Sequence, residues 1–215
     1  PLPLKLIAPT HGPILRERPR RYVARYRELS GADMALEPMP ADAQPLRTLL
    51  VFYLSAYGST GRMAEAIAAG AETVPGIRVS IYDLEGGEVE PFVDLVESAD
   101  AIALGSPTVN GDAVKPVWDL LSSLAVVSLR GKVGAAFGSY GWSGEAVPMI
   151  EDRLRGLKLR VPVAGLRLKL IPTDTELAEC RDFGRALAQA VTGNREAVQG
   201  EPPAARPVID FADLA

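Results

Sequence analysis

Three short segments of this 215-residue chain concentrate the residue types that could bind a ligand. They are Ser-Ala-Tyr-Gly-Ser-Thr-Gly at 55–61, Gly-Ser-Pro-Thr-Val-Asn-Gly at 105–111 and Gly-Ser-Tyr-Gly-Trp-Ser-Gly at 138–144. Each follows an apolar run that indicates a strand, at residues 48–54, 101–104 and 133–137, and each precedes a helical pattern. Loops that leave the carboxyl ends of parallel strands form the ligand crevice of an open sheet. We therefore predict that the three segments form one binding site.

The first segment has the composition of an anion site at the start of a helix. The first amides of a helix lack intrahelical acceptors and lie at the positive end of its dipole, so they bind an anion without a cationic side chain. Ser55, Ser59 and Thr60 add hydroxyl donors, and Gly58 and Gly61 let the backbone come close to a ligand. The alternative is an ordinary helix cap by Ser59 or Thr60. We expect a phosphate here.

The second segment could present backbone groups to the polar edge of a flat ring. It contains Pro107, Thr108, Asn110 and Gly111. Asn-Gly is also a strong turn pair, which explains Asn110 and Gly111 without any ligand.

The third segment places two aromatic residues, Tyr140 and Trp142, between glycines. Such aromatics in a loop suit stacking on a ring, because the glycines let the backbone reach it. A partly buried loop anchor is the alternative for Trp142, whereas Trp118 lies in a helical pattern and is expected in the core.

A phosphate at one end of the site and a flat ring at the other indicate flavin mononucleotide (FMN). The residues predicted to bind it are Ser55, Ala56, Tyr57, Gly58, Ser59, Thr60, Pro107, Thr108, Val109, Asn110, Gly111, Ser139, Tyr140, Gly141, Trp142 and Gly144.

Composition excludes several other classes of function. The balance of 23 basic and 27 acidic side chains gives a net charge of −4, which offers no general attraction to nucleic acid or an anionic membrane. No apolar stretch reaches the roughly 18–20 residues that a membrane span needs. The single cysteine, Cys180, excludes an internal disulfide, a cysteine-based zinc site and an iron–sulfur centre made by this chain alone. A reduced, cytoplasmic setting fits, and the start at Pro1 without Met indicates a fragment or a processed chain.

The order of elements predicts an α/β fold. Strand-like runs at 48–54, 77–84, 101–105, 132–137 and 160–171 alternate with helical patterns at 61–73, 91–98, 114–124, 145–157 and 175–191. Five such units predict a doubly wound, five-stranded parallel sheet with helices on both faces, in three layers α/β/α. We assign 47–193 to this domain, 33–46 to a Pro-rich linker and 194–215 to a tail or second linker.

The three segments together resemble the flavodoxin-like domain of flavodiiron proteins (A-type flavoproteins), over roughly residues 47–193. Residues 1–32 resemble the end of the metallo-β-lactamase-like domain of that family, because 6–13 read Leu-Ile-Ala-Pro-Thr-His-Gly-Pro. There the resemblance implies that His11, the one histidine, is the last iron ligand. The family's other ligands lie upstream of this chain, so a diiron site is expected only together with that missing domain.

The resemblance implies FMN-dependent electron transfer to a diiron site that reduces oxygen or nitric oxide. It also implies a rubredoxin-like or flavin reductase electron donor and a homo-oligomer of the intact protein. Two alternatives remain open at this point: a free-standing NAD(P)H-dependent FMN quinone or flavin reductase, and a flavin-free signalling module of the same fold. A receiver-like module needs acidic residues at the strand ends, whereas the first strand here is followed by Ser55 and Ala56.

Overall fold

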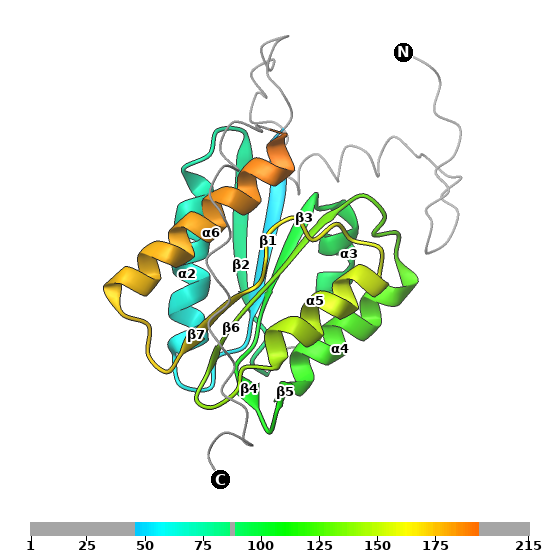
Figure 1. Cartoon of the computed structure of the whole chain (residues 1–215). Helices are drawn as coiled ribbons and strands as arrows, with labels where there is room; N and C mark the ends of the chain where they lie inside the picture. Colours follow the sequence, from blue (N-terminus) through cyan, green and yellow to red (C-terminus); the bar gives the residue numbers. More distant parts are fainter. Residues whose placement is uncertain (1–45, 87–88, 194–215) are drawn as a thin grey trace, which may run out of the picture. The chain divides into compact units, whose positions relative to one another are not determined.

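A parallel sheet of five strands forms the centre of the part of the chain that the computed structural model describes, residues 46–86 and 89–193. The strands are β1 (Arg47–Tyr53), β2 (Ile77–Asp83), β3 (Ala101–Gly105), β6 (Val133–Tyr140) and β7 (Leu166–Lys169). Their spatial order is β2-β1-β3-β6-β7, and every pair is parallel (Figure 1). From β1 the chain adds β2 on one side, and it then returns to add β3, β6 and β7 on the other side. The switch between the two sides lies between β1 and β3, as in the flavodoxin-like arrangement. The predicted fold class is confirmed.

Helices cover both faces of the sheet (Figure 1). One face carries α2 (Ser59–Glu72) and α6 (Asp174–Thr192). The other face carries α3 (Glu90–Ser98), α4 (Lys115–Ser123), the short 3-10 turn η1 (Leu124–Val126) and α5 (Ala146–Gly156). Each predicted helix is present, with both ends within two residues of the predicted bounds.

The two cores explain why the central strands are continuously apolar. Leu49 and Val51 are buried on the face of α2 and α6, whereas Leu50 and Phe52 are buried on the opposite face. Successive side chains of a strand point to opposite faces. A strand covered on both sides therefore has no polar alternation, which is the pattern that the sequence shows.

Two glycines allow α2 and α6 to pack backbone against backbone. A Cβ atom on Gly70 would lie 2.0 Å from the carbonyl oxygen of Arg181, and one on Gly184 would lie 1.9 Å from that of Ile67. Helix α6 begins with a reciprocal cap, in which the Thr173 hydroxyl accepts from the Glu176 amide and the Glu176 carboxylate accepts from the Thr173 amide. The close contact holds α2 in place, and α2 carries the first predicted loop at its N-terminus.

The structure differs from the predicted elements at three points. Strand β6 continues to Tyr140, beyond the predicted end at Phe137, because it pairs with β7 there. Strand β7 is shorter than the predicted run 160–171, since Pro162 lacks the amide that a strand ladder needs and Arg160 forms only an isolated bridge. The second loop contains an unpredicted antiparallel hairpin of β4 (Thr108–Val109) and β5 (Asp112–Ala113).

The predictions for residues 1–32, for the linker up to residue 45 and for 194–215 lie outside the described residues, and so does His11. No helix within the described ranges is both long enough and apolar enough to cross a membrane.

Candidate functional site

The three predicted loops lie at one edge of the sheet. They follow β1, β3 and β6, which are neighbours in the spatial order, and all three strands run in the same direction. Their carboxyl ends therefore meet at the same edge, where the strand order reverses between β1 and β3 (Figure 1). This is the position at which open α/β sheets bind ligands.

The first loop leaves the N-terminus of α2 open. Gly58 is the N-cap residue, with φ 81° in the left-handed region, and no side-chain hydrogen bond from this cap position closes the helix. Ser59 and Thr60 lie inside the first turn rather than before it, so neither is the predicted alternative cap. The Ser55 hydroxyl accepts from the Gly61 amide at 3.1 Å. The amides of Ser59 and Thr60, by contrast, have no acceptor within the helix, which leaves them available to an anion.

The side chains of the first loop divide into exposed and buried sets. Ala56, Tyr57 and Gly58 are exposed, and Tyr57 is 97% exposed. Thr60 is buried, and its hydroxyl lies 2.9 Å from the hydroxyl of Ser139 at the end of β6. The Arg62 side chain, which follows in the same helix, is exposed.

The second loop is the hairpin β4–β5. Its tip is Asn110-Gly111, with φ 52° and φ 73°, as the two central residues of a type I′ turn require. Asn-Gly therefore has a conformational role here whether or not it also contacts a ligand. Val109, the last residue of β4 before the tip, is 47% exposed, and Pro107 at the base is buried.

A buried serine that the sequence interpretation missed holds the base of this hairpin. The Ser106 hydroxyl accepts from the Val114 amide at 3.0 Å and donates to the Pro107 carbonyl oxygen at 2.7 Å. The only sequence signal for Ser106 is its place between Gly105 and Pro107, inside the segment already selected.

Two further contacts fix the hairpin to its surroundings. The Thr108 hydroxyl accepts from the Ala146 amide at the start of α5, at 3.4 Å. The Trp118 indole donates to the Asp112 carboxylate at 2.9 Å. Trp118 is half-buried and packs against the core, as predicted, but its indole N–H bonds to the hairpin instead of lying within the core.

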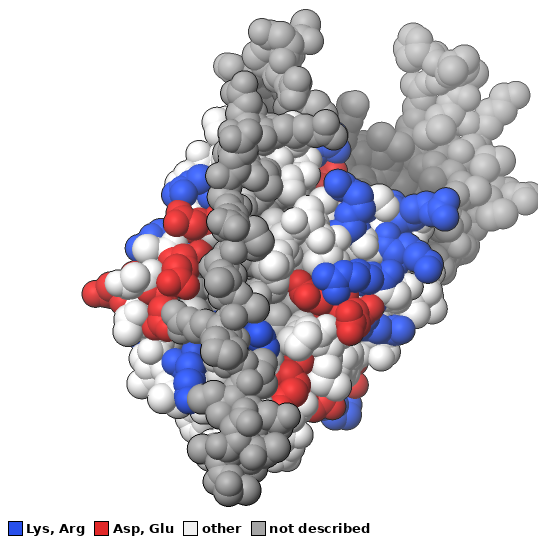
Figure 2. Space-filling view, in the orientation of Figure 1, with Lys and Arg blue, Asp and Glu red and all other residues white. Residues whose placement is uncertain are grey.

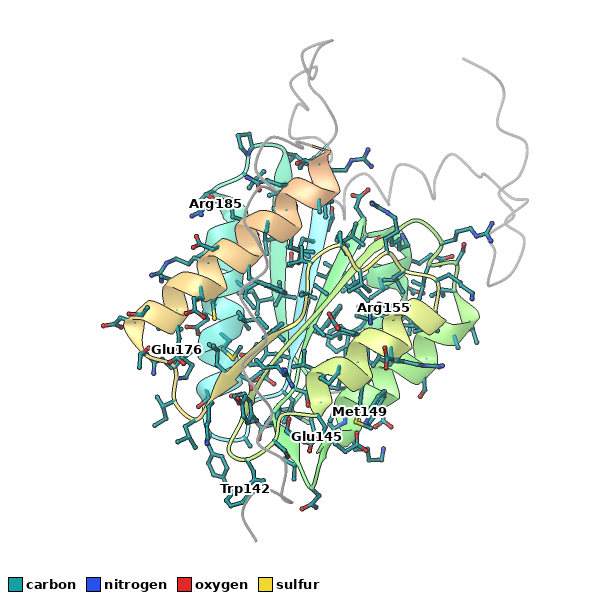
Figure 3. All side chains as sticks on the ribbon, viewed as in Figure 1. Trp142, Glu145, Met149, Arg155, Glu176 and Arg185 are labelled. Atoms are coloured by element: carbon teal, nitrogen blue, oxygen red, sulfur yellow. The ribbon has the colours of Figure 1, made fainter. Side chains whose placement is uncertain are left out.

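The third loop begins at Gly141, because residues 138–140 belong to β6. A Cβ atom on Gly144 would lie 3.0 Å from the ring of Tyr140, so this half-buried ring lies against the backbone of its own loop. Trp142 is 63% exposed, and Figure 3 shows it beyond the carboxyl end of the sheet. The two predicted ring contacts thus differ: Tyr140 is held against the loop, and Trp142 extends from it.

Exposed apolar side chains form a rim at the carboxyl edge of the sheet, on the three loops and on the segment after β7. Tyr57, Val109 and Trp142 come from the three loops, and Leu170 and Ile171, which follow β7, are 62% and 70% exposed. Leu170 belongs to the same edge because its amide donates to the Tyr140 carbonyl oxygen at 2.8 Å. This apolar rim is unlike the far end of α5, over which Lys and Arg side chains gather (Figure 2).

One tyrosine near the first loop has a perturbed pKa. Burial raises the pKa of Tyr53 at the end of β1, and the Asp83 carboxylate and, more weakly, Glu65 add to this effect. The Tyr53 ring lies 3.3 Å from where a Cβ atom on Gly61 would be, so it supports the first turn of α2 from below. The predicted phosphate loop thus rests on a tyrosine whose ionisation is disfavoured.

The residues present fit FMN. The open N-terminus of α2 and its hydroxyls suit a phosphate, and the exposed aromatic side chains at the same edge suit a flat ring. Among the described residues, no group of three or more His, Cys, Asp and Glu side chains could hold a metal ion.

Comparison with known proteins agrees with this geometry. Residues 51–184 match the family model of flavodoxin. The chain is 52% identical over its whole length to the type A flavoprotein fprA of Rhodobacter capsulatus, of which it covers 46%. Among solved structures it is similar to a flavodoxin from the domain Archaea (36% identity, TM-score 0.61, covering 67% of this chain and 99% of that one). It is also similar to the rubredoxin oxygen:oxidoreductase of Desulfovibrio gigas (25% identity, TM-score 0.70, covering 90% and 46%).

The chain spans about half the length of the curated type A flavoproteins that it matches. The family match covers most of the described domain, and the strand order and the loop positions are those of the flavodoxin arrangement. The chain therefore belongs to the flavodoxin family, as a flavodoxin-like FMN domain of the flavodiiron type.

Proposed function

We propose that this domain holds one FMN at the carboxyl edge of the sheet and transfers electrons as one component of an oxidoreductase. The phosphate is placed at residues 55–61, on the N-terminus of α2. The open, glycine-capped start of that helix is the observation that carries the proposal. The ring is placed between the β4–β5 hairpin and the loop 141–144, with Trp142 beside it.

The chain's own residues bind and orient the cofactor in this proposal. Bound FMN supplies reversible one- and two-electron chemistry, and the protein sets its position and surroundings. The first amides of α2 donate hydrogen bonds to the phosphate, and the hairpin presents backbone groups to the ring's polar edge. Because β3 and β6 are buried strands that fix both loops, these groups are positioned before the cofactor binds.

The partner of the flavin in this proposal is a diiron site in a domain that is missing from this chain. Similarity to longer flavodiiron proteins supports this placement, together with the resemblance of residues 6–13 to the end of such a domain. In the intact protein we expect His11 to be an iron ligand. We expect a rubredoxin-like protein or a flavin reductase to be the electron donor and oxygen or nitric oxide to be the electron acceptor. We also expect the intact protein to be a homo-oligomer. The apolar rim offers these partners a surface near the ring. A cytoplasmic location fits the single, buried Cys180.

Joining the chain to its upstream domain tests the role. The 215-residue chain alone should be yellow and reducible, without stoichiometric iron and with only slow oxidation by oxygen. The joined protein should gain oxygen or nitric oxide reductase turnover, and its His11→Ala variant should contain less iron. Two equivalents of iron in the chain alone, or full iron in the joined His11→Ala protein, would refute the assignment.

The free-standing reductase remains the second candidate, because it would use the same three loops. Rapid NAD(P)H oxidation by the purified chain without any protein partner would favour it over the electron-transfer role.

A further inference from the structure

The hydroxyl pair of Thr60 and Ser139 joins two of the three loops. The two oxygens are 2.9 Å apart, although the residues are 79 positions apart in the sequence. Both side chains are buried, with 1% and 8% exposure. Thr60 lies in the first turn of α2, and Ser139 lies near the end of β6, where it pairs with Leu168 of β7. The pair therefore connects the phosphate end of the site to the strand that carries the third loop.

A bound phosphate would fix the direction of this hydrogen bond. A hydroxyl has one hydrogen to donate, and either oxygen could be the donor in the structure. Phosphate oxygens at the start of α2 would draw the Thr60 hydrogen, because the doubly charged group accepts charge-assisted hydrogen bonds. Thr60 can then keep its bond to Ser139 only as an acceptor, so Ser139 becomes the donor.

We propose that Ser139 is a positioning residue for the phosphate. It donates to the Thr60 oxygen and so holds the Thr60 hydroxyl toward the anion, without contact to the ring. This role differs from the direct cofactor contact that the sequence predicts for Ser139, because the Ser139 hydroxyl is bonded to Thr60 in the structure. The inference rests on the proposed placement of the FMN phosphate at α2.

Binding of FMN and riboflavin, which lacks the phosphate, to the apo-chain tests the inference by flavin fluorescence quenching. Ser139→Ala should weaken FMN binding about threefold to tenfold, the usual effect of one lost hydrogen bond, and leave riboflavin binding unchanged. Thr60→Val should weaken FMN more, because a direct donor to the charged group is lost. In the Thr60→Val background, Ser139→Ala should have no further effect on FMN, because the two residues act through one hydrogen bond.

Two matched variants accompany this double-mutant cycle of Ser139→Ala and Thr60→Val. Thr60→Ser keeps the hydroxyl, so Ser139→Ala should retain its full effect on FMN binding in that background. If Thr60→Val does not fold, the comparison of Thr60→Ser with the Thr60→Ser, Ser139→Ala double variant replaces it. Ser123→Ala removes a hydroxyl that bonds to the Asp119 carbonyl oxygen on α4, remote from the loops, and should change neither affinity.

The possible outcomes separate this inference from the proposed function. Equal weakening of FMN and riboflavin by Ser139→Ala would show a ring contact and overturn the inference, as would effects that add in the double variant or no effect at all. Equal affinity of the unmodified chain for FMN and riboflavin would overturn the phosphate placement itself, and the inference with it.

Discussion

Replacement of Gly138 by alanine should destabilise the domain through the backbone of the neighbouring loop. A Cβ atom at Gly138 would lie 2.1 Å from the Ser106 carbonyl oxygen, whereas ordinary contact begins at 3.4 Å. The Ser106 backbone must therefore retreat by about 1.3 Å, the difference between these distances. This movement strains the bonds from the Ser106 amide to Phe137 (3.1 Å) and from the Val114 amide to the Ser106 hydroxyl (3.0 Å).

The magnitude follows from opposing effects. Overpacking with a backbone shift costs about 1–3 kcal/mol, and a weakened hydrogen bond adds about 1 kcal/mol. Alanine regains about 0.5–1 kcal/mol over glycine in a strand. We expect a net loss of about 2 kcal/mol in the free energy of unfolding, which lowers the Tm by roughly 4–8 °C in a domain of this size.

Gly141→Ala is the matched control, three residues further along the same motif. The nearest atom to its Cβ would be a Leu170 methyl carbon at 3.9 Å, so this substitution should change stability by less than about 0.5 kcal/mol. Urea and thermal unfolding followed by circular dichroism measure both variants. If Gly138→Ala were as stable as the parent, or if both variants lost equal stability, the close contact with Ser106 would not be real.

Three further predictions concern the scaffold. Gly184→Ala should lower the free energy of unfolding by about 1–3 kcal/mol, because its Cβ would meet an α2 carbonyl oxygen at 1.9 Å; an unchanged urea midpoint would contradict the close helix contact. For Asp100, partial burial alone would raise the pKa, but the Thr48 amide and Arg47 hold the pKa below its usual value. Ionised Asp100 thus stabilises the fold at pH values above its unfolded pKa of about 3.9, and this contribution is lost as the pH falls through its lower folded pKa. Asp100→Asn should therefore flatten the acid limb of a curve of stability against pH. Burial raises the pKa of the Cys180 thiol to about 12, so a thiol reagent at pH 8.5 should label it only at the rate of unfolding, and rapid labelling would contradict its burial.

Local signals in the sequence predicted most of the fold. Strand β1 is an uninterrupted apolar run because both its faces are covered, and each helix pattern lay within two residues of the observed helix. The three loops could be brought together because the carboxyl ends of parallel strands share one edge. The hairpin had a signal too, since Asn110-Gly111 is the preferred pair for a type I′ turn.

The remaining features depend on contacts between distant residues. Strand β6 extends through Ser139 only because β7 pairs with it, and the Thr60 hydroxyl reaches Ser139 across 79 residues. Gly138 and Gly141 look alike in the motif, yet one lies against a carbonyl oxygen and the other is exposed. No local pattern distinguishes such positions, because the neighbouring chain segment decides them.

Titration of the apo-chain with FMN and riboflavin tests the central claim most directly. We expect one FMN per chain and at least about 100-fold weaker binding of riboflavin. This ratio corresponds to the loss of two hydrogen bonds to a charged group, at about 1.5 kcal/mol each. Equal affinities for the two flavins would contradict the placement of a phosphate on the N-terminus of α2.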